Sequence, residues 1–147
     1  MLGFGNKATE NYRMINPIEH SRTSNAVGKY KVEPYVIPAD IYGSNNLAGR
    51  GGWTWYTGSA SWYFKAGIEY ILGLKIENEM LFFNPCIPKE WKEFNIKYRW
   101  KNSFYNIIIK NPNSKNSGIE KVLLNGIEVQ NGIKLQDNGN YNIEVMM

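Results

Sequence analysis

Cysteine and histidine are nearly missing from this sequence, which contains one of each, Cys86 and His20. A single cysteine excludes a disulfide within the chain and is typical of a reducing compartment. Neither residue has a second cysteine or histidine at the spacing that metal ligands require. We therefore predict no metal site, a structural role for Cys86 and a surface or structural role for His20. A catalytic role for His20, with partners brought from elsewhere in the fold, stays open.

Long apolar runs and runs of like charge are also missing. No stretch is apolar over the length that a bilayer requires, and no signal peptide is present, so we expect a cytoplasmic protein. The formal net charge is +4 at pH 7, and the lysines are scattered along the chain. This distribution does not indicate a nucleic-acid partner. Walker, dinucleotide-binding and Ser-His-Asp patterns are absent as well.

Small and aromatic residues are concentrated in one stretch, from Arg50 to Tyr63. Glycines allow a ligand to approach the backbone closely, and aromatic rings offer flat faces to a sugar. The pattern after this stretch predicts a helix from Ser59 to Leu72, which places Thr57 and Gly58 near a helix N-terminus. Free N–H groups and the helix dipole favour phosphate there. The aromatic side chains could instead be plain core; those that we predict to contact a sugar are Trp53, Trp55 and Tyr56.

Carboxylates are the usual acids of sugar chemistry, but none here has an evident partner. Glu33 and Asp40 are best placed, on the approach to the aromatic stretch, although either could serve as a cap or a surface residue. We therefore assign Glu33 to substrate binding and name no catalytic residue.

The first half of the chain has helical periodicity. A helix is expected from Lys7 to Ile15, with Asn6 as its N-cap and Asn16-Pro17 closing it. Glu19 to Lys31 is polar and irregular. A short helix is expected from Ala39 to Tyr42, with Pro38 at its first turn. The helix after the aromatic stretch is apolar nearly all round, which is typical of a helix buried inside a larger assembly.

The second half alternates between apolar and polar residues, which indicates strands. Strands are expected from Phe94 to Trp100, from Phe104 to Lys110 and from Tyr141 to Val145. Asn125-Gly126 favours a type I′ turn within a hairpin from Val122 to Val129. Short strands at this spacing predict an antiparallel β-sandwich. The sequence thus indicates an α+β protein with two parts, residues 1–74 (helical) and 75–147 (β-sandwich).

Several motifs taken together resemble those of one enzyme family. The segments that carry this resemblance are residues 15–20, residues 30–36, residues 49–62, residues 67–74 and residues 84–88. Together they resemble the carboxyl-terminal end of the family 94 glycoside phosphorylases, and most closely the phosphorylase-like region of cyclic β-1,2-glucan synthetases.

The resemblance implies the last helices of an (α/α)6 barrel followed by a jelly-roll-like sandwich. Family members cleave β-glucosidic bonds with inorganic phosphate as co-substrate and no organic cofactor, inverting the anomeric centre. Their consecutive Thr-Gly binds phosphate and matches Thr57-Gly58. The family's catalytic aspartate, phosphate-binding arginines and phosphate-binding histidine belong to segments that this sequence does not contain, and His20 is not that histidine.

We therefore expect a piece of a larger glucan-processing enzyme, inactive alone, whose partners are a β-glucan oligosaccharide, phosphate and the upstream part of the same enzyme. The resemblance leaves open whether that whole enzyme is membrane-associated. A second interpretation is a non-catalytic carbohydrate-binding module. A third is a structural or interaction piece, which would self-associate through exposed helices.

Overall fold

The computed structural model describes residues 2–55 and 57–147 and contains two compact units. The helical unit comprises residues 10–67, and the sheet unit comprises residues 2–9 and 68–147. Helices together with mainly antiparallel sheets make an α+β protein, which confirms that part of the predicted fold class. The predicted division into 1–74 and 75–147 stays a prediction. Over the described residues, no helix combines the length and the apolar character needed to cross a membrane.

The first helix, α1 (Gly5–Met14), ends shortly before Asn16-Pro17, as the sequence predicts. Asn6 lies inside the helix, so the prediction that it caps the N-terminus is wrong. Its side-chain oxygen accepts a hydrogen bond from the backbone N–H of Lys89 at 3.2 Å, and its amide donates to Glu90 at 3.2 Å. The amide side chain therefore ties the start of the helix to a distant loop of the sheet unit.

Two short helices occupy the segment that the sequence predicts to be irregular: η1 (Glu19–Ser21) and α2 (Ser24–Tyr30). Thr23 caps α2, because its hydroxyl accepts a hydrogen bond from the N–H of Ala26 at 3.1 Å. Tyr30, at the end of α2, forms the small core of the helical unit with Val32 and Val36. The apolar periodicity of α2 is weak, so its cap was the main local signal.

A β-hairpin replaces the short helix expected from Ala39 to Tyr42. Strand β1 (Asp40–Ile41) pairs antiparallel with β2 (Gly51–Gly52). The N–H of Tyr42 donates to Arg50 at 2.9 Å, and the N–H of Ala39 donates to Trp53 at 3.2 Å. The helix prediction is wrong because these backbone groups find partners across the hairpin instead of along a helix.

Helix α3 (Thr57–Lys65) continues into a π-helix at Ala66–Ile71, close to the predicted helix from Ser59 to Leu72. Tyr63 is a buried side chain of α3. Its ring stacks on Tyr12 of α1, with centroids 3.9 Å apart, and its hydroxyl donates to the Tyr12 carbonyl at 3.0 Å. This contact fixes α3 against α1 within the helical unit.

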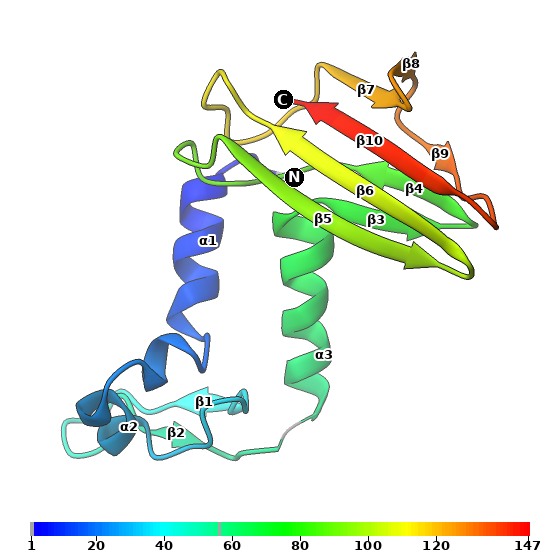
Figure 1. Cartoon of the computed structure of the whole chain (residues 1–147). Helices are drawn as coiled ribbons and strands as arrows, with labels where there is room; N and C mark the ends of the chain where they lie inside the picture. The colour runs from blue at the N-terminus through cyan, green and yellow to red at the C-terminus, as the bar shows by residue number, and fades with distance from the viewer. Residues whose placement is uncertain (1, 56) are drawn as a thin grey trace. The chain divides into compact units, whose positions relative to one another are not determined.

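The sheet unit contains a five-stranded and a three-stranded sheet (Figure 1). The larger sheet has the order β5-β6-β10-β7-β8, made by β5 (Glu93–Trp100), β6 (Ser103–Lys110), β10 (Asn140–Met146), β7 (Lys121–Leu124) and β8 (Ile127–Val129). The smaller has the order β3-β4-β9, made by β3 (Leu74–Glu77), β4 (Met80–Phe83) and β9 (Ile133–Lys134).

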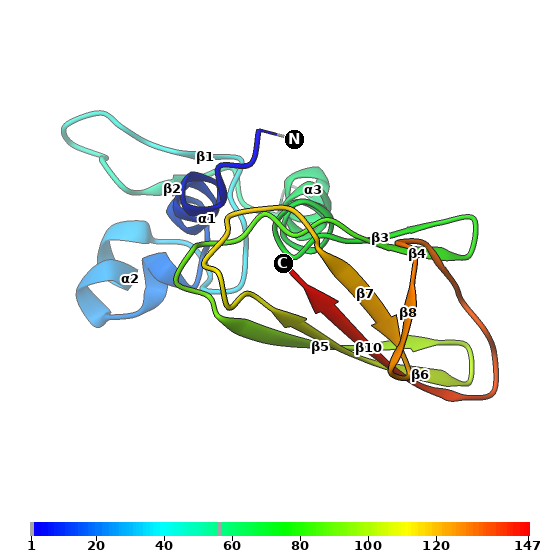
Figure 2. The same ribbon diagram turned by 90° about the horizontal axis from the view of Figure 1, so that it is seen from above.

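One central pair corrects the expectation of purely antiparallel strands. Strand β10 runs parallel to β6, with Ile143 opposite Ile107, and antiparallel to β7, so it joins two antiparallel ladders (Figure 2). The alternation of apolar and polar residues predicts β6 and β10 as strands but not that they pair, since side chains alternate with a period of two in parallel and antiparallel ladders alike.

Turn chemistry is predicted correctly. Asn125 and Gly126 both have positive φ angles, 49° and 83°, and connect β7 to β8 as a two-residue hairpin. Buried side chains from both sheets then form the core of this unit, with Leu81, Ile109 and Val145 each fully enclosed.

Asn111 is a buried polar residue whose side-chain groups are all used. Its amide donates to the carbonyls of Trp91 at 3.1 Å and Lys115 at 2.8 Å, and its oxygen accepts from the N–H of Lys115 at 2.8 Å. We predict that Asn111→Ala lowers the free energy of unfolding by about 2 to 4 kcal/mol, because buried backbone groups lose their partners. Chemical denaturation measures this. The exposed Asn113→Ala is the control, and an equal loss in both variants would contradict the assignment.

Asp137 makes the stability of the folded chain depend on pH. Hydrogen bonds from the backbone N–H groups of Asn102 and Asn138 lower the pKa of its carboxyl below the ordinary value of 3.8. A lowered folded-state pKa contributes stability that is present above the ordinary pKa and is lost as pH falls through the folded value. We predict that Asp137→Ala is less stable than the native chain at neutral pH, and that the difference shrinks below about pH 4. Thermal unfolding across pH measures it; a pH-independent difference would refute it.

Candidate functional site

The first two tryptophans of the aromatic stretch, Trp53 and Trp55, are exposed instead of forming the core. Trp53 and Trp55 lie directly after β2, and 72% and 62% of their surfaces are accessible. Both have positive φ angles, 48° and 63°. Bulky residues rarely adopt this conformation, and such strain is concentrated at functional sites. The backbone therefore presents both indoles outward at a cost in local conformational energy.

Glu33 and Trp55, which the sequence predicts as substrate-binding residues, are in contact. The indole N–H of Trp55 donates to the carboxylate of Glu33 at 3.1 Å. The ring of Tyr35 meets Trp55 edge to face, with centroids 6.2 Å apart and planes at 66°. We call Glu33, Tyr35 and Trp55 the indole cluster. The hydrogen bond and the second ring hold an exposed indole in one orientation, which lowers the entropy that a ligand must overcome.

The predicted phosphate-binding residues lie at the start of α3. The helix begins at Thr57, and Gly58 is exposed in its first turn. The N–H groups of a first turn have no partner inside the helix. Tyr56 and the side chain of Thr57 lie outside the described part of the structure. The predicted role of the backbone at this turn therefore stands on the helix geometry alone.

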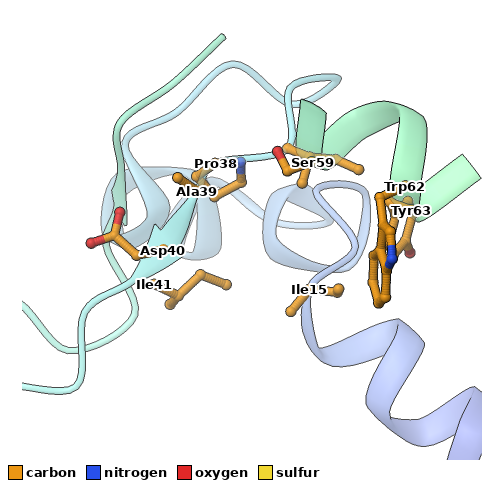
Figure 3. Close-up of a pocket in the computed structure, with 9 residues that line it drawn as sticks. Ile15, Pro38, Ala39, Asp40, Ile41, Ser59, Trp62 and Tyr63 are labelled. Atoms are coloured by element: carbon orange, nitrogen blue, oxygen red, sulfur yellow. The ribbon is translucent and has the colours of Figure 1, made fainter. Parts of the chain in front are cut away.

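A cavity of about 420 Å³ lies beside the first turns of α3 (Figure 3). Ser59, Trp62 and Tyr63 of α3 line one side, and Ala39, Asp40 and Ile41 line another. Figure 3 shows Trp62 and Ile15 across the hollow from Asp40. Most of the lining is apolar, and it includes none of the four predicted residues that the structure describes outside Tyr56 and Thr57, which are Glu33, Trp53, Trp55 and Gly58.

Asp40 lines the cavity, but its carboxylate points away from Trp62 and lies over β2 (Figure 3). A Cβ atom built on Gly52 would lie 2.6 Å from the Asp40 carboxylate oxygen. Inverting glycoside chemistry needs an acid directed at the leaving oxygen and a separate nucleophile. Asp40 is the one carboxylate among the residues that line the hollow, so the described lining does not hold a catalytic pair. Residues 2–55 and 57–147 also contain no cluster of three or more histidine, cysteine, aspartate or glutamate side chains that could hold a metal ion.

Gly51 and Gly52 have a packing role that differs from the interpretation as a ligand approach. A Cβ atom at Gly51 would lie 2.4 Å from Val32, and one at Gly52 would lie 2.6 Å from the hydroxyl of Tyr42. The glycines are therefore required because the unit's own side chains cover β2.

His20 has a structural role, as expected. Its Nε2–H donates to the carbonyl of Met14 at 2.6 Å, and its ring stacks on Tyr30 with centroids 4.9 Å apart. Burial raises the pKa of the Tyr30 hydroxyl to about 12, so the side chain of Tyr30 remains neutral at physiological pH.

Two residues at these positions were missed by sequence reasoning, Tyr35 and Ser59, whereas Trp62 was weighed with the other aromatic side chains as either core or ligand contact. Tyr35 is exposed between Pro34 and Val36, and its aromatic ring beside a proline was an available signal. Ser59 was seen only as a part of the helix, because a cavity between α3 and the hairpin leaves no local pattern.

Comparison with known protein families finds matches for two adjacent segments of the chain, which together end at residue 115. The model of the family described as "Glycosyl hydrolase 94 superfamily, catalytic domain" matches residues 1–73. The model of the family described as "Glycosyl hydrolase family 65, C-terminal domain" matches residues 74–115.

Curated relatives include the cyclic beta-(1,2)-glucan synthase NdvB of Rhizobium meliloti, 44% identical over 70% of this chain and 4% of the relative. The N,N'-diacetylchitobiose phosphorylase of Vibrio furnissii is 32% identical over 96% of this chain and 17% of the relative. The solabiose phosphorylase of Paenibacillus borealis is 31% identical over 88% of this chain and 16% of the relative. The chain thus spans less than a fifth of the length of these relatives. Through its residues 1–73, this chain belongs to the glycosyl hydrolase 94 superfamily.

Proposed function

We propose that this chain is the carboxyl-terminal part of a glucan-processing glycoside phosphorylase or glycosyltransferase. In this proposal Thr57 and Gly58 contribute to a phosphate site, and Trp53, Trp55, Tyr56 and Glu33 form a wall that contacts the glucan. The observation that carries it is the start of α3 at Thr57, two residues after Trp55, whose exposed indole is held in place by Glu33. An anion at the first turn and a sugar against the indole are the two ligands of phosphorolysis.

The whole enzyme would supply the catalytic aspartate and the phosphate-binding arginines and histidine that the resemblance places outside this sequence. Residues 1–74 would be the last helices of an (α/α)6 barrel, and the sheets would form a jelly-roll-like sandwich. Exposed apolar side chains in the helical unit, such as Ile18, Trp62 and Phe64, support the packing of an upstream part against them. In the isolated chain the same side chains favour self-association. Inorganic phosphate would be the co-substrate, without an organic cofactor.

The isolated chain is expected to be inactive. Asp40 is the one carboxylate in the described lining of the cavity beside α3 and has no acidic partner there, and most of the stabilisation of a transition state comes from positioned acids and charge partners. A second candidate function, a carbohydrate-binding module, is favoured by the indole cluster, because an oriented exposed indole can bind a sugar without phosphate.

The proposed phosphate site leads to a prediction about turnover and phosphate binding. The purified chain should release no glucose 1-phosphate from β-1,2-glucan in the presence of inorganic phosphate. Titration with phosphate should nevertheless shift the backbone amide resonances of Gly58 and Ser59 in NMR spectra, because their N–H groups face the anion. Gly58→Asp should abolish these shifts through charge repulsion, and the neutral Gly58→Asn should retain them.

The amide of Gly126, a glycine in an exposed turn of the sheet unit, is the reference for that titration. Equal shifts at Gly126 and Ser59 would indicate a non-specific salt effect and refute the phosphate site. Turnover that survives repurification would refute the expected inactivity.

A further prediction concerns the proposed sugar wall, the surface formed by Trp53, Trp55, Tyr56 and Glu33. Trp55→Ala should weaken the binding of β-1,2-linked gluco-oligosaccharides about fivefold in calorimetry, since one aromatic contact is worth about 1 kcal/mol. Glu33→Gln keeps an acceptor for the indole and should bind nearly as the native chain does, whereas Glu33→Ala should bind more weakly. Phe104→Ala, which removes an exposed ring of the sheet unit, is the control.

If the native chain binds these oligosaccharides equally well with and without phosphate, the binding-module function is favoured over the phosphorylase piece. Unchanged affinity in Trp55→Ala would remove the indole cluster from either function.

A further inference from the structure

A second cavity lies entirely within the sheet unit. It has a volume of about 470 Å³ and is lined by Glu69, Tyr70, Gly73, Lys75, Phe82, Phe83, Asn84, Ile119 and Asn131. A volume of this size lies in the range of small-molecule sites. None of its lining residues belongs to the indole cluster or to the first turn of α3.

Strand register explains why aromatic and polar groups meet there. Lys75 of β3 is directly opposite Phe82 of β4, so both side chains lie on the same face of the small sheet. Leu74 and Phe83, the next pair, point to the opposite face and are buried. The cavity is therefore formed on the outer face of β3 and β4, beside the core.

The walls of this cavity are rigid. The N–H of Asn84 donates to the Gly73 carbonyl at 2.7 Å, and a Cβ atom on Gly73 would lie 2.2 Å from the backbone of Asn84. Asn131 uses both groups of its amide on the backbone of Phe83, at 3.0 and 2.8 Å. A Cβ atom on Gly132 would lie 3.0 Å from the ring of Phe82, so that ring packs directly on the glycine backbone. A ligand would thus meet a wall that is already ordered.

The chemistry of the lining fits a neutral sugar. Tyr70 is 56% exposed, and Phe82 is partly exposed, so two aromatic rings offer apolar faces. Among the described contacts, the exposed side-chain amide of Asn84 has no hydrogen-bond partner and can both donate to and accept from hydroxyl groups. Amide and aromatic groups together match the hydroxyl edge and the C–H face of a pyranose ring.

Charge disfavours an anionic ligand in this cavity. The ammonium group of Lys75 lies 2.6 Å from the carboxylate of Glu77, and Glu69 adds a further carboxylate to the lining. The lysine is therefore already compensated, unlike the cations of phosphate sites.

We propose that this cavity, formed by Tyr70, Lys75, Phe82 and Asn84, is a binding site for a neutral sugar residue such as one glucosyl unit of a glucan chain. Tyr70 and Phe82 contact the ring face, and Asn84 hydrogen-bonds the hydroxyl groups. The site would hold a glucan independently of the proposed phosphate site.

The test is an NMR titration of the full chain with sophorose, the β-1,2-linked glucose disaccharide, and separately with inorganic phosphate. Sophorose should shift the amide resonances of Tyr70, Lys75 and Asn84, and phosphate should not. Tyr70→Ala and Asn84→Ala should each weaken the sophorose affinity read at Lys75 about three- to tenfold. Tyr70→Phe retains the ring and should bind as the native chain does.

Trp55→Ala should leave these shifts unchanged, which separates this site from the proposed sugar wall. Loss of the Gly58 response to phosphate would refute the proposed function but not this site. The proposal is overturned if sophorose leaves all three amides unmoved, if phosphate moves them as strongly, or if Tyr70→Ala, folded by its NMR spectrum, binds sophorose with native affinity.

Discussion

The stack of Tyr63 on Tyr12 is the contact on which the candidate site depends. It joins α3 to α1 through two parallel rings and a hydrogen bond from the Tyr63 hydroxyl to the backbone. Gly67 extends the contact, because a Cβ atom there would lie 2.6 Å from the Tyr12 hydroxyl. With α3 fixed in this way, its first turn and the cavity beside Ser59 have defined positions. Burial of the Tyr63 hydroxyl strongly raises its pKa, so this contact persists across the physiological pH range.

The two units differ in how much apolar surface they bury. The described core of the helical unit is small, with Tyr30, Val32 and Val36 at its centre. The sheet unit encloses side chains from both of its sheets. Most exposed large hydrophobic side chains of the described residues belong to the helical unit. This exposed apolar surface supports the proposal that the unit packs against an upstream part, and the curated relatives are more than five times the length of this chain.

The aromatic stretch and the outer face of the three-stranded sheet present aromatic side chains in different ways. Trp55 stands on a strained backbone and is oriented by a carboxylate and a neighbouring ring. Phe82 stands on a regular strand and is oriented by close packing on Gly132. In both places a side chain is exposed and yet restricted, which is the physical requirement for contacting a sugar without a large loss of conformational entropy.

Local chemistry in the sequence determined several parts of this protein. Alternation predicts β5, Asn125-Gly126 predicts the β7–β8 hairpin, and Asn16-Pro17 predicts the end of α1, because each depends on side-chain period or on allowed φ angles. The family resemblance, carried by several short segments in order, was likewise available from the sequence.

Tertiary structure alone decided which segments became neighbours. The parallel pairing of β10 with β6 and the pairing of β1 with β2 depend on backbone partners distant in sequence. The contact of Glu33 with Trp55 joins residues 22 positions apart. The two cavities arise where separate elements meet. Short-range patterns report the conformation of a segment, whereas these features depend on which other segment satisfies its hydrogen bonds and covers its apolar face.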